Sequence, residues 1–358
     1  MKKISYLAPW LGLLIGLAVS CLLALLFKEN PLHVLKVLST GFMASKFDLG
    51  LTLFYTTCLI FSGLAFSIPM KAGLFHIGSE GQIIASALVI AALGNLMVPH
   101  AGALSVLLTL LLAVLLTLST GAAAALLIGL FKIYRQAHEV VVAIMLNFIL
   151  AALATWATIH HLQNPDSQNP ETGLINESFR FLQNDFLKVY FDNSAVSIFL
   201  LLAIFCCSLL YFLEKRTVFF YRMKAYGQNS AAAERIHIGQ IQSAGLALVL
   251  AGFFSALVGL TEVMGNTFQY KIGFSPQYGF LGIAVALLAR QNFIGILGSA
   301  FLMACLHKGA SDLDLETEYL TRDFSKVLQA IIIFSVAASY TLFNSKWSFL
   351  KRKESPDG

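Results

Sequence analysis

The feature that most constrains this chain is a succession of apolar runs, most of them about 20 residues long, separated by short polar stretches. A helix needs roughly 20 apolar residues to cross a hydrocarbon core about 30 Å thick. Only 12% of the residues are charged and 58% are hydrophobic, whereas a soluble domain carries about a quarter charged residues. Because so few charges cannot cover a water-soluble core, the pattern predicts an all-α, polytopic membrane protein.

The apolar runs predict about eight to ten membrane-crossing helices, with about ten as the preferred number. The expected spans are residues 6–27, 49–69, 82–99, 103–131, 139–160, 195–214, 243–264, 279–289, 293–308 and 326–345. The runs at 279–289 and 293–308 are individually short. We expect them to form either two brief helices around a tight turn or one broken, re-entrant element.

Basic residues set the orientation, because loops on the cytoplasmic side carry an excess of Lys and Arg. More Lys and Arg fall on the side of the N-terminus than on the other side, and Asp and Glu crowd the polar stretch 161–193. We therefore expect both termini in the cytoplasm, an external loop at 161–193 and an internal loop at 215–242. The single transmembrane domain is predicted to cover 1–345, followed by a basic tail at 346–358.

The decamer GLFHIGSEGQ, residues 73–82, places glycines and a glutamate between two apolar runs. Non-helical backbone is tolerated in a membrane only where protein or a water-filled cavity covers it. Glu80 is then expected at the N-terminus of the next helix, where the helix dipole favours an anion. An ordinary cytoplasmic turn is the alternative. The residues assigned to a structural motif are Gly73, Phe75, Gly78, Glu80, Gly81 and Gln82.

Residues 262–292 are the strongest pointer to a substrate path, since a glycine-interrupted segment between two helices is typical of one. Aromatic rings there either stack a flat ligand or lie at the membrane interface. An asparagine within a membrane helix holds helices together or lines a pathway. The candidate path residues are Asn147, Glu262, Asn266, Phe274 and Tyr278.

Motifs of catalysis are missing from the sequence. It contains no phosphate-binding G-x-x-x-x-G-K-[ST] loop, no H-E-x-x-H and no G-x-S-x-G. The cysteines lie inside apolar runs without metal-ligand spacing. We expect no catalytic residues, no metal site and no cofactor, so that any ATP used is bound by a partner subunit.

Four separated motifs resemble the permease subunits of bacterial ATP-binding-cassette (ABC) importers, in the nucleoside and simple-sugar branch of the ribose/branched-chain amino acid type. Residues 73–82 are similar to G-[LI]-F-N-I-G-A-E-G-Q, with His76 and Ser79 as departures. Residues 138–147 resemble H-E-V-I…I-M-L-N, and residues 273–288 resemble G-F-S-P-x-Y-G-F-x-G-I-A-V-A-L-L. Residues 224–238 are similar to the coupling segment R-A-x-G-x-N-P-x-A-A-x-x-x-G-I, with Ser230 and His237 as departures.

The resemblance, which covers roughly residues 50–345, implies a permease domain that works by alternating access driven by a separate ATPase. Residues 224–238 are expected to form one short rigid helix that docks in the ATPase. The residues assigned to this coupling are Lys224, Ala225, Gly227, Asn229, Ala232, Ala233 and Ile238. The implied partners are the ATPase, a second permease in a heterodimer, an extracytoplasmic substrate-binding lipoprotein, a small-molecule substrate and the bilayer of the bacterial inner membrane, without nucleic acid.

One other class of protein remains open at this stage. A secondary transporter driven by an ion gradient would use Glu80 and Glu262 as proton carriers, because both are acidic residues next to membrane helices. It would transport its substrate without a second chain.

Overall fold

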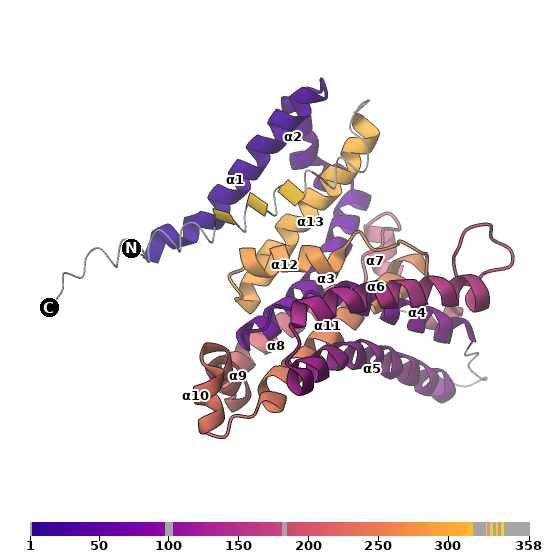
Figure 1. The fold of residues 1–358 in the computed structure, drawn as a ribbon. Coiled ribbons are helices and arrows are strands. Elements are labelled where there is room, and N and C mark those ends of the chain that lie inside the picture. Colours follow the sequence, from indigo (N-terminus) through magenta and orange to yellow (C-terminus); the bar gives the residue numbers. More distant parts are fainter. Residues whose placement is uncertain are drawn as a thin grey trace. The chain divides into compact units, whose positions relative to one another are not determined.

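A computed structural model describes residues 2–96, 103–180 and 185–317, with isolated positions between 327 and 339. The α-helices are α1 (Lys2–Leu26), α2 (Pro31–Thr40), α3 (Lys46–Lys71), α4 (Ser79–Leu96), α5 (Ala103–Arg135), α6 (Glu139–Ala157), α7 (Asp185–Tyr190), α8 (Phe199–Arg216), α9 (Val218–Gln228), α10 (Ser230–Arg235), α11 (Leu246–Glu262), α12 (Tyr278–Leu288) and α13 (Phe293–Glu316). The described residues contain no β-strand, only isolated bridges between Gln163 and Thr172 and between Glu171 and Lys271. The predicted all-α fold is confirmed (Figure 1).

Short helical segments extend or connect several of these helices. They are η1 (Gly41–Met43) and η3 (Glu177–Phe179), which are 3₁₀ turns, and η2 (Thr158–Leu162), η4 (Ile241–Gly245) and η5 (Val263–Thr267), which are π-helical. The π-helical segments continue α6 and α11 or lead into them. Together with α11, the segments η4 and η5 form one apolar element over Ile241–Thr267.

Six helical elements among the described residues are long and apolar enough to cross a membrane. They are Lys46–Lys71, Ser79–Leu96, Leu104–Arg135, Glu139–Leu162, Ile241–Thr267 and Phe293–Glu316, and Leu14–Leu26 and Tyr278–Leu288 are shorter apolar helices. These elements match the apolar runs of the sequence and make the chain a multi-pass membrane protein. The expected span at 326–345 lies mostly, and the basic tail at 346–358 wholly, outside the described residues.

The predicted end of one span at residue 308 is wrong, because α13 continues to Glu316. The sequence from 308 onward is polar, but the charges of Lys308 and Asp312 are paired within the protein. Lys308 Nζ lies 2.6 Å from Asp312 Oδ1, one helical turn further on, and 2.9 Å from Asp48 Oδ1. Ion pairing between positions i and i+4 lets the helix continue through residues that otherwise favour water.

The chain divides into two compact units, residues 1–52 with 302–358, and residues 53–301. In the first unit, α2 is a helix that the apolar runs did not predict. Its N-cap is Asn30, whose side chain accepts a hydrogen bond from the Leu32 amide, and Pro31 stands at its first position. Val34, Val37 and Leu38 pack with residues of α1 and α13. The expectation of one functional domain over 1–345 stays a prediction.

In the second unit, α4, α5 and α11 pack against one another through glycines (Figure 1). A Cβ on Gly252 of α11 would lie 2.1 Å from the Gly121 carbonyl oxygen of α5. A Cβ on Gly259 would lie 2.8 Å from the Ala87 nitrogen of α4. Such backbone contact is how membrane helices gain dispersion energy where no hydrophobic effect drives them together.

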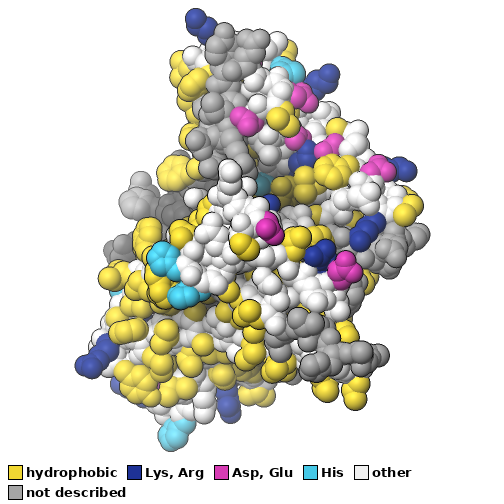
Figure 2. All heavy atoms as spheres, turned by 90° about the vertical axis from the view of Figure 1, so that its right-hand side faces the viewer, with side chains coloured by type: hydrophobic (Ala, Val, Ile, Leu, Met, Phe, Trp, Pro, Cys, Tyr) yellow, Lys and Arg dark blue, Asp and Glu magenta, His cyan; other side chains and the backbone are white. Residues whose placement is uncertain are grey.

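The α6 helix is covered little by the rest of the chain, since only 11% of its most apolar window is buried. Its exposed side chains include Phe148, Leu153 and Trp156. Figure 2 shows that hydrophobic side chains cover much of the face drawn there. Surfaces of this kind suit lipid or another membrane subunit, not water.

Candidate functional site

The helix α12 is too short to cross a membrane alone. Its 11 residues span roughly 16 Å, about half of a hydrocarbon core. It is followed by a tight turn and then by α13, so the stretch predicted as brief helices or a broken element consists of a half-length helix and a full-length one. A half-length helix leaves its N-terminal amides, and the positive end of its dipole, inside the protein.

Glu80 occupies this N-terminus. Its carboxylate is 9% exposed and its Oε2 accepts a hydrogen bond of 2.8 Å from the Gly279 amide in the first turn of α12. Glu80 itself lies in the first turn of α4, as predicted. The N-termini of α4 and α12 therefore meet at one carboxylate, which interacts favourably with both dipoles. A Cβ on Gly279 would lie 2.5 Å from the Glu80 nitrogen, so only glycine allows this approach.

Asn147 of α6 binds the decamer through both ends of its amide. The Gly81 amide donates to Asn147 Oδ1 and Asn147 Nδ2 donates to the Ile77 carbonyl, each at 2.9 Å. A Cβ on Gly81 would lie 2.8 Å from the Asn147 Cα, so the two backbones are in close contact. The sequence left two roles open for Asn147, and this geometry supports the one in which it holds helices together. Its role in a substrate path stays a prediction.

Most other residues of the decamer are buried, whereas Gly73 and Phe75 are exposed. Gly73 has a φ of +76°, a left-handed conformation that glycine adopts without strain. His76 Nε2 lies 3.2 Å from Gln82 Oε1, and both side chains are buried. Phe75 is 37% exposed and meets Phe66 edge-on with ring centroids 5.0 Å apart. The decamer is thus a packed element and not a turn in water.

Glu262 is a second buried acidic residue in contact with the first turn of α12. Asn266 Nδ2 donates to Glu262 Oε1 at 2.8 Å, and the Tyr278 hydroxyl donates to Glu262 Oε2 at 3.4 Å. Tyr278 and Gly279 are adjacent, so two neighbouring residues of α12 connect to two different carboxylates. The structure therefore brings together Glu80, Glu262, Asn266 and Tyr278 of the predicted residues.

Phe274 is half-buried against Tyr270, with ring centroids 5.6 Å apart. The predicted external loop folds over the same stretch. The Thr172 amide donates to the Tyr270 carbonyl at 2.9 Å, and Gln269 Nε2 donates to Glu171 Oε2 at 3.0 Å. The turn before α12 is thereby fixed to residues almost a hundred positions earlier in the chain.

The expected single coupling helix within 224–238 is wrong, because the segment consists of two helices, α9 and α10, that meet at Asn229. Asn229 has extended backbone, and its Oδ1 accepts a hydrogen bond of 3.0 Å from the Ala232 amide. It is the N-cap of α10. An asparagine favours this position because its side chain replaces a missing helical hydrogen bond.

The α9–α10 segment packs directly on the start of the decamer. A Cβ on Gly227 would lie 2.5 Å from the Lys71 carbonyl oxygen, and a Cβ on Gly73 would lie 3.1 Å from the Gly227 Cα. Leu74 belongs to a buried cluster with Tyr226, Ala233 and Ile238. Ala233 is buried within this chain, whereas Ala232 is exposed.

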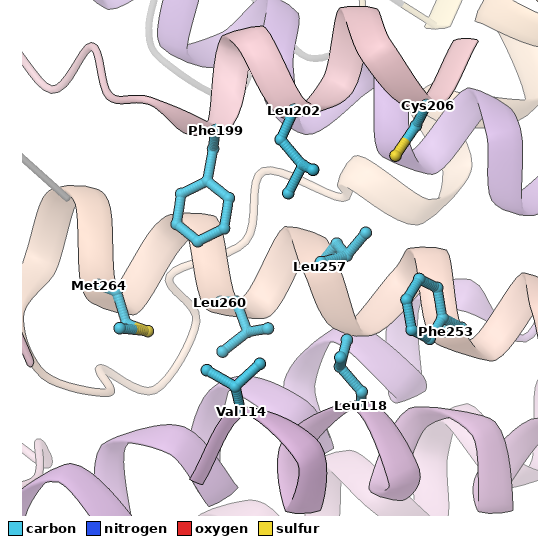
Figure 3. A pocket seen from close by; sticks show the side chains of 9 residues that line it. All are labelled: Val114, Leu118, Phe199, Leu202, Cys206, Phe253, Leu257, Leu260 and Met264. Atoms are coloured by element: carbon cyan, nitrogen blue, oxygen red, sulfur yellow. The ribbon is translucent and has the colours of Figure 1, made fainter. Parts of the chain in front are cut away.

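An apolar cavity of about 320 Å³ separates part of α8 from α5 and α11 (Figure 3). It is lined by Val114, Leu118, Phe199, Leu202, Cys206, Phe253, Leu257, Leu260 and Met264. None of these side chains carries a strong hydrogen-bonding group. The cavity therefore offers nothing to orient a polar molecule, and none of its residues belongs to the predicted substrate path.

Sequence reasoning missed the contacts made by residues at the ends of the apolar runs. Lys71 and Glu214 stand at the ends of apolar runs, yet their side chains are largely buried, and Lys71 Nζ lies 2.6 Å from Glu214 Oε1. A boundary lysine and a boundary glutamate on the same predicted side of the membrane were the available signal. Their pairing needs the fold, because they are separated by 143 positions.

The arrangement is that of a multi-pass membrane protein with full-length apolar helices, one half-length helix whose N-terminus lies inside the protein, and a short helix pair packed against residues 71–74. The comparisons agree. The chain belongs to the family of the branched-chain amino acid transport system permease component, whose model matches residues 48–337.

Individual relatives cover nearly the whole chain. The nucleoside ABC transporter permease protein NupB of Lactococcus lactis is 30% identical, over 95% of this chain and 93% of its own length. The guanosine ABC transporter permease protein NupP of Bacillus subtilis is 28% identical, over 96% of each chain. The glucose ABC transporter permease protein TsgB13 of Haloferax volcanii is 24% identical, over 94% and 88%. No solved structure matches the chain.

Proposed function

We propose that this chain is the membrane-spanning subunit of an ABC importer for nucleosides or related sugars. The observation that carries the proposal is the likeness to two nucleoside permeases along almost the entire chain. One of the relatives is a glucose permease, and for this reason the proposed cargo includes simple sugars.

The charges inside the protein support an uncharged cargo. The positive end of α12 is already occupied by the Glu80 carboxylate. Lys71 and Lys308, whose side chains are 7% and 6% exposed, each bind carboxylates of this chain. An amino acid or a nucleotide would need a free cation or a free helix N-terminus to hold its anionic group. A nucleoside or a sugar needs only hydrogen bonds and apolar or aromatic contact.

The proposed assembly contains a separate ATPase, a second permease and an external substrate-binding lipoprotein in the bacterial inner membrane. Both termini of this chain and the α9–α10 segment face the cytoplasm. The ATPase binds the exposed side of this segment, including Asn229 and Ala232, and the buried side transmits the movement to the decamer. The binding protein supplies most of the selectivity, and the membrane path passes near Asn266, Phe274 and Tyr278. Neither ATP nor another cofactor is bound by this chain.

The test is reconstitution of the complete transporter in proteoliposomes, with uptake of labelled guanosine, other nucleosides, glucose and leucine measured with and without ATP. ATP-dependent uptake of a nucleoside or sugar supports the proposal. Uptake of leucine alone contradicts the proposed cargo.

The same vesicles test the ion-gradient alternative, which the comparisons do not favour. Both carboxylates that it would use accept hydrogen bonds from donors of this chain, Gly279 for Glu80 and Asn266 for Glu262. Uptake by this chain alone, abolished by a protonophore and independent of ATP, would contradict the proposed ABC mechanism.

A further inference from the structure

The ends of α3, α8 and α9 meet at an ion-pair cluster centred on Glu214. Glu214 Oε1 lies 2.6 Å from Lys71 Nζ and 2.8 Å from Lys224 Nζ. The Lys71 and Glu214 side chains are 7% and 13% exposed, whereas Lys224 is 45% exposed. A pair with so little solvent around it attracts strongly, because the effective dielectric constant is low.

The same cluster reaches the turn between α12 and α13. Lys71 Nζ donates to the Gln291 carbonyl oxygen at 2.9 Å and lies 4.6 Å from the ring centroid of Phe293. Phe293 is fully buried and packs edge-on against Phe220 of α9. One ammonium group therefore holds the end of α3, the end of α8 and the start of α13 in a fixed arrangement.

The two lysines share a single oxygen atom of Glu214, which makes their positions interdependent. If α9 shifts, Lys224 moves relative to this oxygen, and the charge left on Glu214 is balanced by Lys71 alone. Farther along α8, the apolar cavity leaves part of the helix without close contact to α5 and α11. The position of α8 therefore depends strongly on the contacts at its Glu214 end.

We propose that Glu214 is a positioning residue for energy coupling: through Lys224 and Lys71 it links movement of the α9–α10 segment to α3, α8 and the α12–α13 turn. The inference rests on the proposed function, in which an ATPase moves this segment. It adds a route of transmission that runs beside the direct backbone contact between Gly227 and Gly73. Glu214 touches neither cargo nor ATP in this scheme.

The experiment compares wild-type transporter with Glu214→Gln and Glu214→Asp in proteoliposomes that contain the complete complex. The readout is the number of cargo molecules imported per ATP hydrolysed, measured with assembly and ATPase rate in the same preparation. We expect Glu214→Gln to assemble and to hydrolyse ATP within about twofold of wild type, while the import ratio falls at least tenfold. Glu214→Asp keeps the charge and restores most of the ratio. Lys215→Gln is the matched control, since Lys215 is exposed and its ammonium group contacts Tyr211 of its own helix.

A purely structural role for Glu214 would lower assembly and both activities together, leaving the ratio unchanged, and this result would overturn the inference. If Glu214→Gln does not assemble, Lys224→Gln decides, because the half-exposed Lys224 can be neutralised without leaving a deeply buried charge. A reduced ratio in Lys224→Gln supports the inference and an unchanged ratio overturns it. A wild-type complex without ATP-dependent uptake would instead refute the proposed function, so the two failures are distinguishable.

Discussion

The contact between α12 and α4 makes a sharp prediction for Gly279→Ala. The new Cβ would lie 2.5 Å from the Glu80 nitrogen and 2.9 Å from its Cα. Both are backbone atoms in the first turn of α4, so no rotation of a side chain can relieve the overlap. To reach ordinary contact at 3.4 Å or more, the start of α12 must move by about 1 Å.

The cost follows from this displacement. Overpacking in a close-packed interior costs about 1–3 kcal/mol, and a strained hydrogen bond to a charged acceptor loses part of about 1.5–3 kcal/mol. Replacing a helical glycine by alanine recovers up to about 1 kcal/mol. We therefore expect a net destabilisation of about 2–4 kcal/mol. An unfolding entropy of about 2.1 cal/mol/K per residue gives this chain of 358 residues a shift of about 1.3 °C per kcal/mol, so the midpoint of thermal unfolding should fall by about 3–5 °C.

The assay is thermal unfolding of the purified chain in detergent, with Gly298→Ala as the matched control. Gly298 also lies in a helix, but a Cβ there would meet nothing within 4 Å. Its substitution should leave the midpoint unchanged or raise it slightly, since alanine favours the helix. The reasoning is refuted if Gly279→Ala and Gly298→Ala unfold at the same temperature.

Four further substitutions test three other contacts. Asn147→Leu should lower stability by about 1–2 kcal/mol, measured by thermal unfolding in detergent, because both hydrogen bonds to the decamer are lost; unchanged stability would contradict the joining role. Ala233 is buried and Ala232 is exposed, so Ala233→Glu should lower the melting temperature of this chain alone. Ala232→Glu should leave the melting temperature unchanged and weaken co-purification with the ATPase. Equal melting temperatures of the two variants would contradict this packing. Lys308→Met should destabilise the chain by about 3–5 kcal/mol in the same unfolding assay, because Asp48 and Asp312 lose their cation. A variant as stable as wild type would contradict this and show that the two carboxylates are protonated or solvated.

The sequence predicts the fold class and most membrane helices because apolar runs of the required length report directly on the solvent around them. It also places Glu80 at a helix start, since glycines and a carboxylate before an apolar run are an N-terminal signal. The sequence does not identify the hydrogen-bond donor that Glu80 binds. The Gly279 amide is 199 positions away from Glu80, and no local pattern connects the two.

The two wrong predictions, the end of α13 and the single coupling helix, also arise from contacts that the local sequence pattern does not show. The end of α13 was placed too early because Lys308 and Asp312 read as polar residues, and their neutralisation depends on Asp48 from a distant helix. The α9–α10 segment was expected as one helix because its alanines favour helix throughout. The break comes from the side chain of Asn229, which caps the second helix in place of continuing the first.

Glu80 and Glu262 are buried although burying a carboxylate costs free energy, and their hydrogen bonds indicate what they contribute in return. An acidic side chain at the centre of a membrane helix costs about 2.5–3.5 kcal/mol, and a hydrogen bond to a charged group returns about 1.5–3 kcal/mol. Glu80 with Gly279 and Glu262 with Asn266 are therefore close to neutral in stability. These glutamates fix positions: Glu80 binds Gly279 and Glu262 binds Tyr278, which are neighbouring residues of α12. Gly227 lies in close contact with Gly73, the first residue of the decamer that contains Glu80. Displacing Gly227 would therefore move the start of the decamer, whose Glu80 carboxylate is bound to the first turn of the half-length helix.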